Sequence, residues 1–234
     1  MSVIPRRERL IVALDVASPA EARALAEKLG DAARFYKVGL ELFSSGGAFE
    51  LMAWLTARGN KVFADLKLYD IPQTVRRAVA NLRGRGATFL TVHGHRSLMQ
   101  AAAEEKGEMK ILAVTVLTSF DQRDLEEMGA NRSTEELVLA RARGALDTGC
   151  DGVIASGLEA KRLKTEFGDK LLVVTPGIRP IDKRAGDDQK RTVDVAQAFA
   201  NGADYIVVGR PIHQAADPRA AAQAIQDSIA AIFP

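Results

Sequence analysis

Short apolar runs of strand length recur along the whole chain, separated by alanine-rich, charged stretches. The stretches PAEARALAEKLG from Pro19 and TEELVLARARGALDTG from Thr134 carry apolar residues at helical spacing. Gly30, Gly149 and Gly202 stand where helices of this kind would end. The eight runs are LIVALDV from Leu10, FYKVGLEL from Phe35, KVFADLKL from Lys61, TFLTVHG from Thr88, ILAVTVLT from Ile111, DGVIAS from Asp151, LLVVTPG from Leu171 and DYIVVGRP from Asp204.

The alternation of these runs with helices predicts the fold. Strands rich in valine, isoleucine and leucine pair in parallel when helices cover both faces of the sheet. Eight such units predict a single-domain (β/α)8 TIM barrel of the α/β class that spans residues 1–234. A hydrophobic content of 47% supplies one substantial core for such a barrel. An open, doubly wound sheet is the alternative.

Composition narrows the classes of function and the compartment. The chain has 32 lysines and arginines against 30 acidic residues, a net charge of +2 that does not favour a general nucleic-acid or membrane-surface role. The first apolar run contains Asp15 and is too short to cross a bilayer, so we expect a cytoplasmic protein. Cys150 is the only cysteine, which excludes an internal disulfide and indicates a packing role.

Polar residues gather at the ends of the predicted strands, where active sites of barrel enzymes lie. A charge inside an apolar strand is costly to bury unless it is paired. Several charges at equivalent strand ends therefore predict one shared site. The residues at these ends are Asp15, Lys37, Asp65, Lys67, His93, Thr118 and Ser119.

The segment VFADLKLYDIPQT, from Val62 to Thr74, carries the most chemical information. Residues two apart on a strand share a face, so Asp65 and Lys67 point the same way, into the barrel mouth. A structural ion pair is the alternative interpretation of their spacing. Asp70 follows just before an Ile-Pro pair that suits a first helical turn, so on its own it would be interpreted as a helix cap.

Asp65, Lys67 and Asp70 match the D-x-K-x-x-D pattern of the orotidine 5'-phosphate decarboxylase superfamily. The extension through Ile71, Pro72 and Thr74 narrows the resemblance to the decarboxylases themselves. Further matches follow in order along the chain: ALDV at 13–16, YKVGLELF at 36–43, VLTS at 116–119, TPGIRP at 175–180, DDQKR at 187–191 and GRPI at 209–212. The resemblance implies cofactor-free decarboxylation of orotidine monophosphate to uridine monophosphate, the last step of de novo pyrimidine synthesis.

The resemblance also assigns catalytic roles. Loss of carbon dioxide leaves a carbanion at C6 of the pyrimidine, which Lys67 would protonate, and Asp65 would lie near the departing carboxylate. Because C6 has no adjacent electron sink, catalysis has to come from charges positioned beforehand. Lys37 and Asp70 would complete the charge network, with Asp70 contributed to the partner's site in a homodimer.

The remaining site residues would hold the nucleotide. By resemblance, Asp15 and Lys37 contact the ribose, with Thr74 joining from the partner subunit. Phosphate binding also has a physical basis, because barrel enzymes bind phosphate through the loops after strands seven and eight. Those loops supply Arg179, Gly209 and Arg210. The pyrimidine would be held by Thr118, Ser119, Pro176 and Gln189; without the resemblance, Thr118 and Ser119 would be loop polar residues or caps, and the DDQKR segment a solvated charge run.

The residues also suggest three other functions. His93, His95 and His213 suggest a metal, but a catalytic metal usually has three protein ligands, so we expect none; His93 would belong to the barrel mouth and His95 to a loop. A magnesium-dependent sugar-phosphate lyase of the same superfamily would share D-x-K-x-x-D but not the I-P-x-T extension. A non-catalytic barrel that only binds uridine monophosphate would have little use for Lys67.

Overall fold

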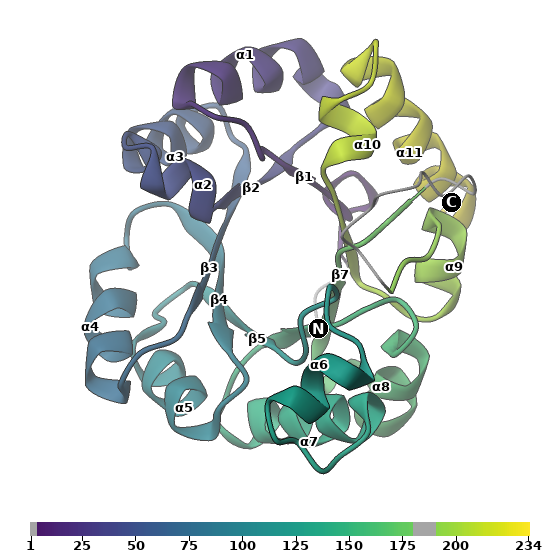
Figure 1. Cartoon of the computed structure of the whole chain (residues 1–234). Helices are drawn as coiled ribbons and strands as arrows, with labels where there is room; N and C mark the ends of the chain where they lie inside the picture. The colour runs from purple at the N-terminus through teal and green to yellow at the C-terminus, as the bar shows by residue number, and fades with distance from the viewer. Residues whose placement is uncertain (1–3, 180–190) are drawn as a thin grey trace.

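The computed structural model describes residues 4–179 and 191–234, in which eight parallel strands close into a barrel surrounded by helices (Figure 1). The strands are β1 Leu10–Ala13, β2 Phe35–Gly39, β3 Lys61–Leu68, β4 Ala87–His93, β5 Lys110–Val114, β6 Gly152–Ile154, β7 Leu172–Thr175 and β8 Tyr205–Val208. The α-helices are α1 Pro19–Leu29, α2 Leu40–Ser44, α3 Ala48–Ala57, α4 Pro72–Leu82, α5 Arg96–Glu105, α6 Gln122–Glu127, α7 Thr134–Asp147, α8 Ala160–Phe167, α9 Val195–Ala200, α10 Arg210–His213 and α11 Pro218–Ile232. Three 3-10 helices are η1 Arg6–Glu8, η2 Gly30–Ala32 and η3 Gly168–Lys170.

The pairing of the first and last strands decides between the two predicted sheets. β1 pairs in parallel with β8, with Leu10 opposite Ile206, so the sheet has closed. The (β/α)8 barrel is therefore confirmed, and the open doubly wound alternative is wrong. Each of the eight predicted runs overlaps one of the strands, although β4 and β5 begin one residue earlier than predicted, at Ala87 and Lys110. That one domain extends over all of residues 1–234 stays a prediction.

Most of the predicted runs extend past the carboxyl end of the strand they contain, and the second and fifth runs show how. The run from Phe35 leaves the sheet after Gly39, and Leu40–Ser44 forms the short helix α2. The alternating apolar pattern misleads here because Leu40 is not buried: it is 66% exposed. Similarly, the fifth run ends as strand at Val114, and the segment from Thr115 to Thr118 belongs to the loop that follows.

The core has an outer layer between strands and helices and an inner layer inside the barrel. Four aromatic rings dominate the inner layer. The ring of Phe89 lies 4.9 Å from that of Phe35, 5.1 Å from that of Tyr205 and 6.0 Å from that of Phe63. These contacts fill the interior below the strand ends, so the polar residues above them face a cavity with an apolar floor.

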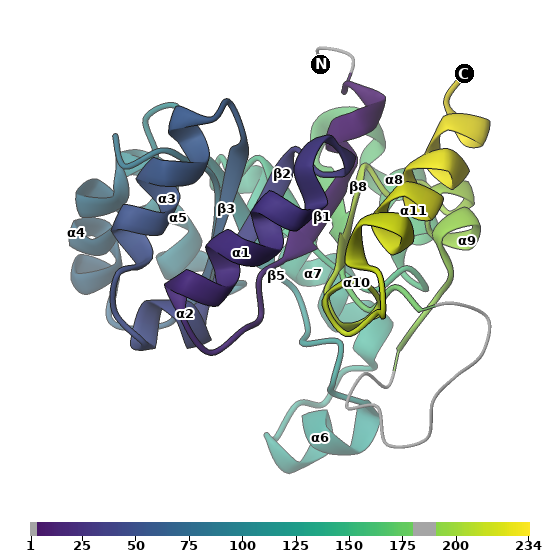
Figure 2. The same cartoon turned by 90° about the horizontal axis from the view of Figure 1, so that it is seen from above.

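Figure 2 shows the two ends of the barrel from the side. The helix η1 and the carboxyl end of α11 lie at one end, where the guanidinium of Arg9 stacks 3.8 Å from the ring of Phe233. Helix α6 lies at the opposite end, beyond the carboxyl ends of the strands. None of the helices in the described ranges could cross a membrane.

Cys150 is buried just before β6, with its thiol 3.8 Å from the Met99 carbonyl oxygen. Burial raises the pKa of this thiol to about 11. The thiol is therefore protonated at neutral pH, in agreement with the packing role predicted for it.

Candidate active site

A cavity of about 550 Å³ opens at the carboxyl ends of the strands. Its floor is the inner layer of the barrel, represented by Phe63 and Val114. The predicted site residues that line it are Asp15, Lys37, Asp65, Lys67, Thr118, Ser119, Pro176, Arg179, Gly209 and Arg210. The structure thus brings together ten of the residues that the sequence singled out.

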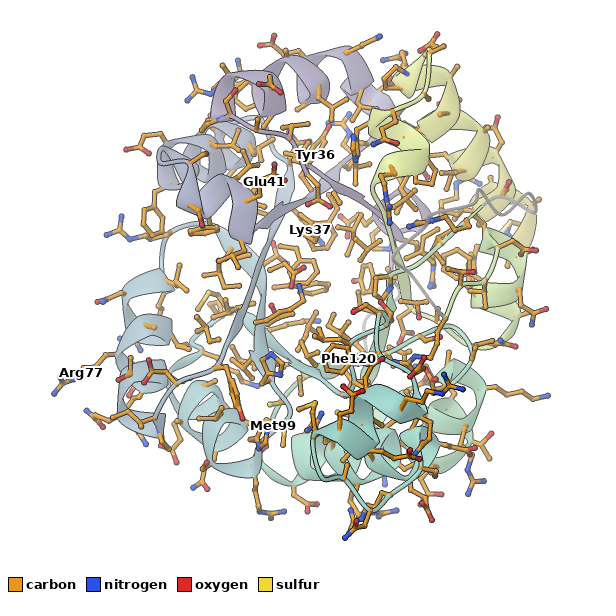
Figure 3. The ribbon with its side chains drawn as sticks, in the orientation of Figure 1. Tyr36, Lys37, Glu41, Arg77, Met99 and Phe120 are labelled. Atoms are coloured by element: carbon orange, nitrogen blue, oxygen red, sulfur yellow. The ribbon has the colours of Figure 1, made fainter. Side chains whose placement is uncertain are left out.

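Four charged side chains of alternating sign form a chain across one wall of the cavity. The ammonium of Lys37 lies 2.7 Å from Asp15 Oδ1 and 3.7 Å from Asp65 Oδ2. The ammonium of Lys67 lies 2.8 Å from the same Asp65 oxygen. Figure 3 shows Lys37 pointing into the barrel, whereas Arg77 of α4 points outward.

Burial and ion pairing shift the pKa values of the two innermost charged groups, Asp65 and Lys37, in opposite directions. Burial alone would raise the pKa of Asp65, but the ammonium groups of Lys37 and Lys67 outweigh it and hold that pKa below its ordinary value. Burial would likewise lower the pKa of Lys37, but the carboxylates of Asp65 and Asp15 raise it. Both groups are therefore ionised at neutral pH, and the charge chain is complete.

Strand β3 is irregular at Asp65 and Lys67, its two residues in the charge chain. The four-residue step from Ala64 to Leu68 faces the two-residue step from Leu90 to Val92 on β4. Lys67 has φ +47°, and no other non-glycine residue in the described part of the chain has a positive φ. Bulges re-aim side chains beside active sites, and strained backbone clusters there too. No residue pattern in this segment predicts the irregularity.

Thr91 is a polar residue at the site that the sequence analysis missed. It is fully buried on β4, where its hydroxyl lies 2.8 Å from Asp65 Oδ1 and accepts a 2.9 Å hydrogen bond from the Lys67 backbone N–H. A signal was available: Thr91 is two residues from Phe89 and from His93, so all three point to one face of the strand.

Asp70 and Thr74 do not line the cavity of their own chain; both are exposed. Asp70 Oδ1 accepts a 2.6 Å hydrogen bond from the Ile71 N–H, but the N-cap residue of α4 is Ile71 itself, so Asp70 is not the helix cap. The side chains beside Asp70 are unusually exposed for their types, at 64% for Tyr69 and 67% for Ile71. The role of Asp70 and Thr74 at a partner's site stays a prediction.

The far wall of the cavity is built from loops. Gly209 immediately follows β8 and caps α10, which begins at Arg210. A Cβ at Gly209 would come within 3.4 Å of Asp15 Oδ2 and of Ala13 Cβ, so the absence of a side chain keeps this corner open. Arg179 is held at the end of β7 by a 3.0 Å hydrogen bond from its N–H to the Val193 carbonyl oxygen.

Arg191 is not solvated, contrary to the alternative interpretation of the DDQKR segment as a solvated charge run. Its side chain is 11% exposed and pairs at 2.5 Å with Glu159, which is 10% exposed. The same guanidinium donates to the carbonyl oxygens of Val116 and Leu117, directly before Thr118. Residues 187–190 of this segment, and the predicted pyrimidine contact Gln189 with them, lie outside the described residues.

The three histidines do not gather. His93 ends β4 as predicted, but its ring contacts that of Tyr69 at 4.8 Å instead of lining the cavity, and His95 stacks on Tyr69 at 5.0 Å. His213 does line the cavity, with its Nε2 buried and unpaired. Across residues 4–179 and 191–234, no group of three histidine, cysteine or acidic side chains could hold a metal ion.

Comparison with known proteins agrees with this arrangement. The model of the orotidine 5'-phosphate decarboxylase / HUMPS family matches residues 8–225. The chain belongs to this family. Among family relatives, the orotidine 5'-phosphate decarboxylase of Methylococcus capsulatus is 59% identical over 230 residues, which cover 98% of this chain and 95% of that protein. The one from Xanthomonas euvesicatoria is 52% identical over 97% of this chain and 94% of its own length.

Solved structures within the family have the same barrel. The orotidine 5'-phosphate decarboxylase of Lactobacillus acidophilus superposes with a TM-score of 0.84 at 38% identity, covering 95% of this chain and 99% of that one. The enzyme of the same name from Pyrococcus horikoshii gives a TM-score of 0.74 at 29% identity, covering 94% and 99%. The family resemblance drawn from the D-x-K-x-x-D segment is thus confirmed over nearly the whole chain.

Proposed function

We propose that this protein decarboxylates orotidine 5'-monophosphate to uridine 5'-monophosphate, the last step of uridine monophosphate synthesis, without a metal or organic cofactor. The observation that carries the proposal is the charge chain Asp15–Lys37–Asp65–Lys67 at the cavity mouth, whose two inner members, Lys37 and Asp65, are largely buried. The names of the family relatives support the same substrate. The free, protonated thiol of Cys150 accords with a reducing compartment, and we place the reaction in the cytoplasm.

The reaction breaks the bond between C6 and its carboxylate and leaves the electron pair on C6. The ammonium of Lys67 stabilises this developing charge and then transfers a proton to C6, after which its amine regains a proton from solvent. Asp65 stays ionised in its buried position, so its negative charge lies near the substrate carboxylate and favours its departure as carbon dioxide. Lys37 keeps Asp65 and Asp15 fixed.

The rest of the cavity holds the nucleotide. Its volume of about 550 Å³ falls within the range of small-molecule sites. Asp15 and Lys37 bind the ribose hydroxyls, and Arg179 and Arg210 bind the phosphate, with Gly209 allowing its close approach. The pyrimidine contacts are Thr118, Ser119, Pro176 and, outside the described residues, Gln189.

We further propose that two copies form a homodimer in which Asp70 and Thr74 complete each other's site. Both residues are exposed and do not line their own cavity, and the apolar side chains on either side of Asp70 in the chain, Tyr69 and Ile71, are exposed too. Such a patch is typical of a protein interface.

Subunit mixing tests the dimer. Lys67→Ala and Asp70→Ala homodimers are expected to be inactive, but a heterodimer of the two has one site with both lesions and one with neither. Random mixing should then restore about a quarter of the wild-type activity, since half the dimers are mixed and each has one intact site. If no activity returns while mixed dimers are shown to form, Asp70 acts within its own chain.

The reaction itself is tested by the ultraviolet absorbance change as orotidine monophosphate becomes uridine monophosphate. Purified protein in excess chelator is expected to turn the substrate over, and the Lys67→Ala variant is not. Activity that disappears with chelator and returns with magnesium would instead indicate a sugar-phosphate lyase. Tight binding of uridine monophosphate without turnover would indicate a nucleotide-binding barrel and overturn the proposal.

A further inference from the structure

Thr91 connects the two residues at the centre of the charge chain. Its side chain lies inside the barrel on β4 and is fully buried. Its Oγ1 is 2.8 Å from Asp65 Oδ1 and 2.9 Å from the backbone nitrogen of Lys67. No solvent reaches this hydroxyl, so these two groups decide how it is oriented.

The direction of both hydrogen bonds follows from their chemistry. A backbone N–H can only donate, so the Thr91 oxygen accepts from Lys67. An ionised carboxylate can only accept, so the Thr91 proton points to Asp65. The single hydroxyl proton is therefore fixed, and a side chain that lacks either the donor or the acceptor could satisfy only one of the two partners.

Each bond restrains a different feature of the site. The bond from the Lys67 N–H holds that residue at φ +47°, a conformation that side-chain-bearing residues rarely adopt. The bond to Asp65 occupies Oδ1 and leaves Oδ2 facing Lys67 Nζ at 2.8 Å and Lys37 Nζ at 3.7 Å. One side chain on β4 thus sets the bulge of β3 and the rotation of the Asp65 carboxylate.

We propose that Thr91 is a positioning residue for the decarboxylation: its hydroxyl holds Lys67 and Asp65 in the reactive arrangement and does not itself contact the substrate. This inference rests on the proposed function. It is distinct from a packing role, because packing depends on the volume of the side chain, whereas positioning depends on its ability to accept and donate at once.

A substitution series at Thr91 separates the two roles. Valine has nearly the shape of threonine without the hydroxyl, serine keeps the hydroxyl but loses a methyl group, and cysteine offers a weak donor. A positioning role ranks turnover as serine first, then cysteine, then valine. A packing role ranks valine first and serine last.

The expected result for Thr91→Val is a fall in kcat of about 10- to 100-fold, the loss that corresponds to a hydrogen bond to a charged group, with KM changed by less than about threefold. Thr91→Ser is expected to stay within about threefold of the wild type in kcat. Because Thr91→Val also leaves a buried N–H unpaired, the Ser and Cys variants keep the test decisive if the Val variant does not fold.

Thr115→Val is the matched control. Thr115 is also a fully buried threonine, but its hydroxyl donates at 2.8 Å to the Ile154 carbonyl oxygen and is hydrogen-bonded to neither Asp65 nor Lys67. This variant loses a buried hydrogen bond and should lose stability without losing turnover. Equal falls in kcat for Thr91→Val and Thr115→Val would overturn the positioning role.

The pH profile supplies a second readout. The hydrogen bond from Thr91 helps to hold the pKa of Asp65 down. In Thr91→Val that pKa rises, so the acid limb of the kcat profile should move to higher pH, whereas a structural defect alone would scale the profile without moving it. Wild-type protein that does not turn over orotidine monophosphate would refute the proposed function; active wild type with an unchanged Thr91→Val refutes only this inference.

Discussion

The two walls of the cavity are built by different means. On the wall formed by β1 to β4, which we call the strand wall, the charges project from within the strands or shortly after them, and each is paired with the next. On the wall formed by β5 to β8, which we call the loop wall, the polar groups belong to loops beyond the strand ends, and hydrogen bonds between loops hold them. Lys37 is typical of the first wall and Arg179 of the second.

This difference corresponds to different demands of the proposed reaction. In that reaction, charges that act on C6 have to be fixed beforehand, and side chains on strands are positioned more precisely than side chains on loops. Groups that bind a nucleotide have to admit and release it, which loops allow. We therefore expect substitutions on the strand wall to lower kcat and substitutions on the loop wall to act on affinity or stability.

The largest effect is expected from Asp65→Asn. The change removes the negative centre between Lys37 and Lys67, and kcat should fall by about a thousandfold or more. Steady-state kinetics measure it. Asp151→Asn is the matched control: Asp151 pairs with Lys106 at 2.9 Å just before β6, away from the cavity lining, and its loss should lower stability but leave kcat intact. Similar kcat values for the two variants would contradict the claim that the charges on the strand wall determine kcat.

Arg210→Ala is expected to lower kcat/KM by about a hundredfold, because the proposed contact between its guanidinium and the substrate phosphate would be lost. Orotidine, which lacks the phosphate, should be converted equally slowly by the variant and the wild type. Arg219→Ala provides the control, since Arg219 pairs with Asp31 on the surface. A variant that loses as much activity on orotidine as on the phosphorylated substrate would place Arg210 outside phosphate binding.

Arg191→Met tests what holds the loop wall together. The change leaves Glu159 buried without its partner, so the free energy of unfolding should fall by about 3 kcal/mol. Urea denaturation measures it. The double variant Arg191→Met, Glu159→Met should regain much of the loss because no uncompensated charge remains. Failure of the double variant to recover would indicate that the hydrogen bonds to Val116 and Leu117 are the larger contribution.

The smallest effect is a pH dependence of the free energy of unfolding, caused by the titration of Asp65 and Lys37 on the strand wall. The pKa of Asp65 is lowered in the folded protein, so its contribution is complete above the unfolded value of about 3.9 and is lost as pH falls through the folded pKa. The pKa of Lys37 is raised, so its contribution is complete below about 10.4 and is lost as pH rises through the folded pKa. Unfolding measured across this range should show a shallower acid slope in Asp65→Asn, and an unchanged slope would contradict the assignment.

Local patterns were enough to predict the strands, the closed barrel and the shared face of Asp65 and Lys67. They failed where the answer depends on how two distant segments pair. The bulge at Lys67 is a matter of register between β3 and β4, and the roles of Thr91 and Arg191 are set by partners 26 and 32 residues away along the chain. The alternating apolar pattern also could not distinguish the helix α2 from a continued strand, because Leu42 would be buried in the core in either case.

The burial of Cys150 makes the protein convenient for spectroscopy. Its thiol is the only one in the sequence, and it is shielded and protonated at neutral pH. A cysteine introduced at an exposed position such as Leu158, on the loop after β6, would then react with a maleimide dye far faster than the native thiol. Single-site labelling of the loop wall is possible without first removing a native residue, so a fluorophore could record nucleotide arrival in real time.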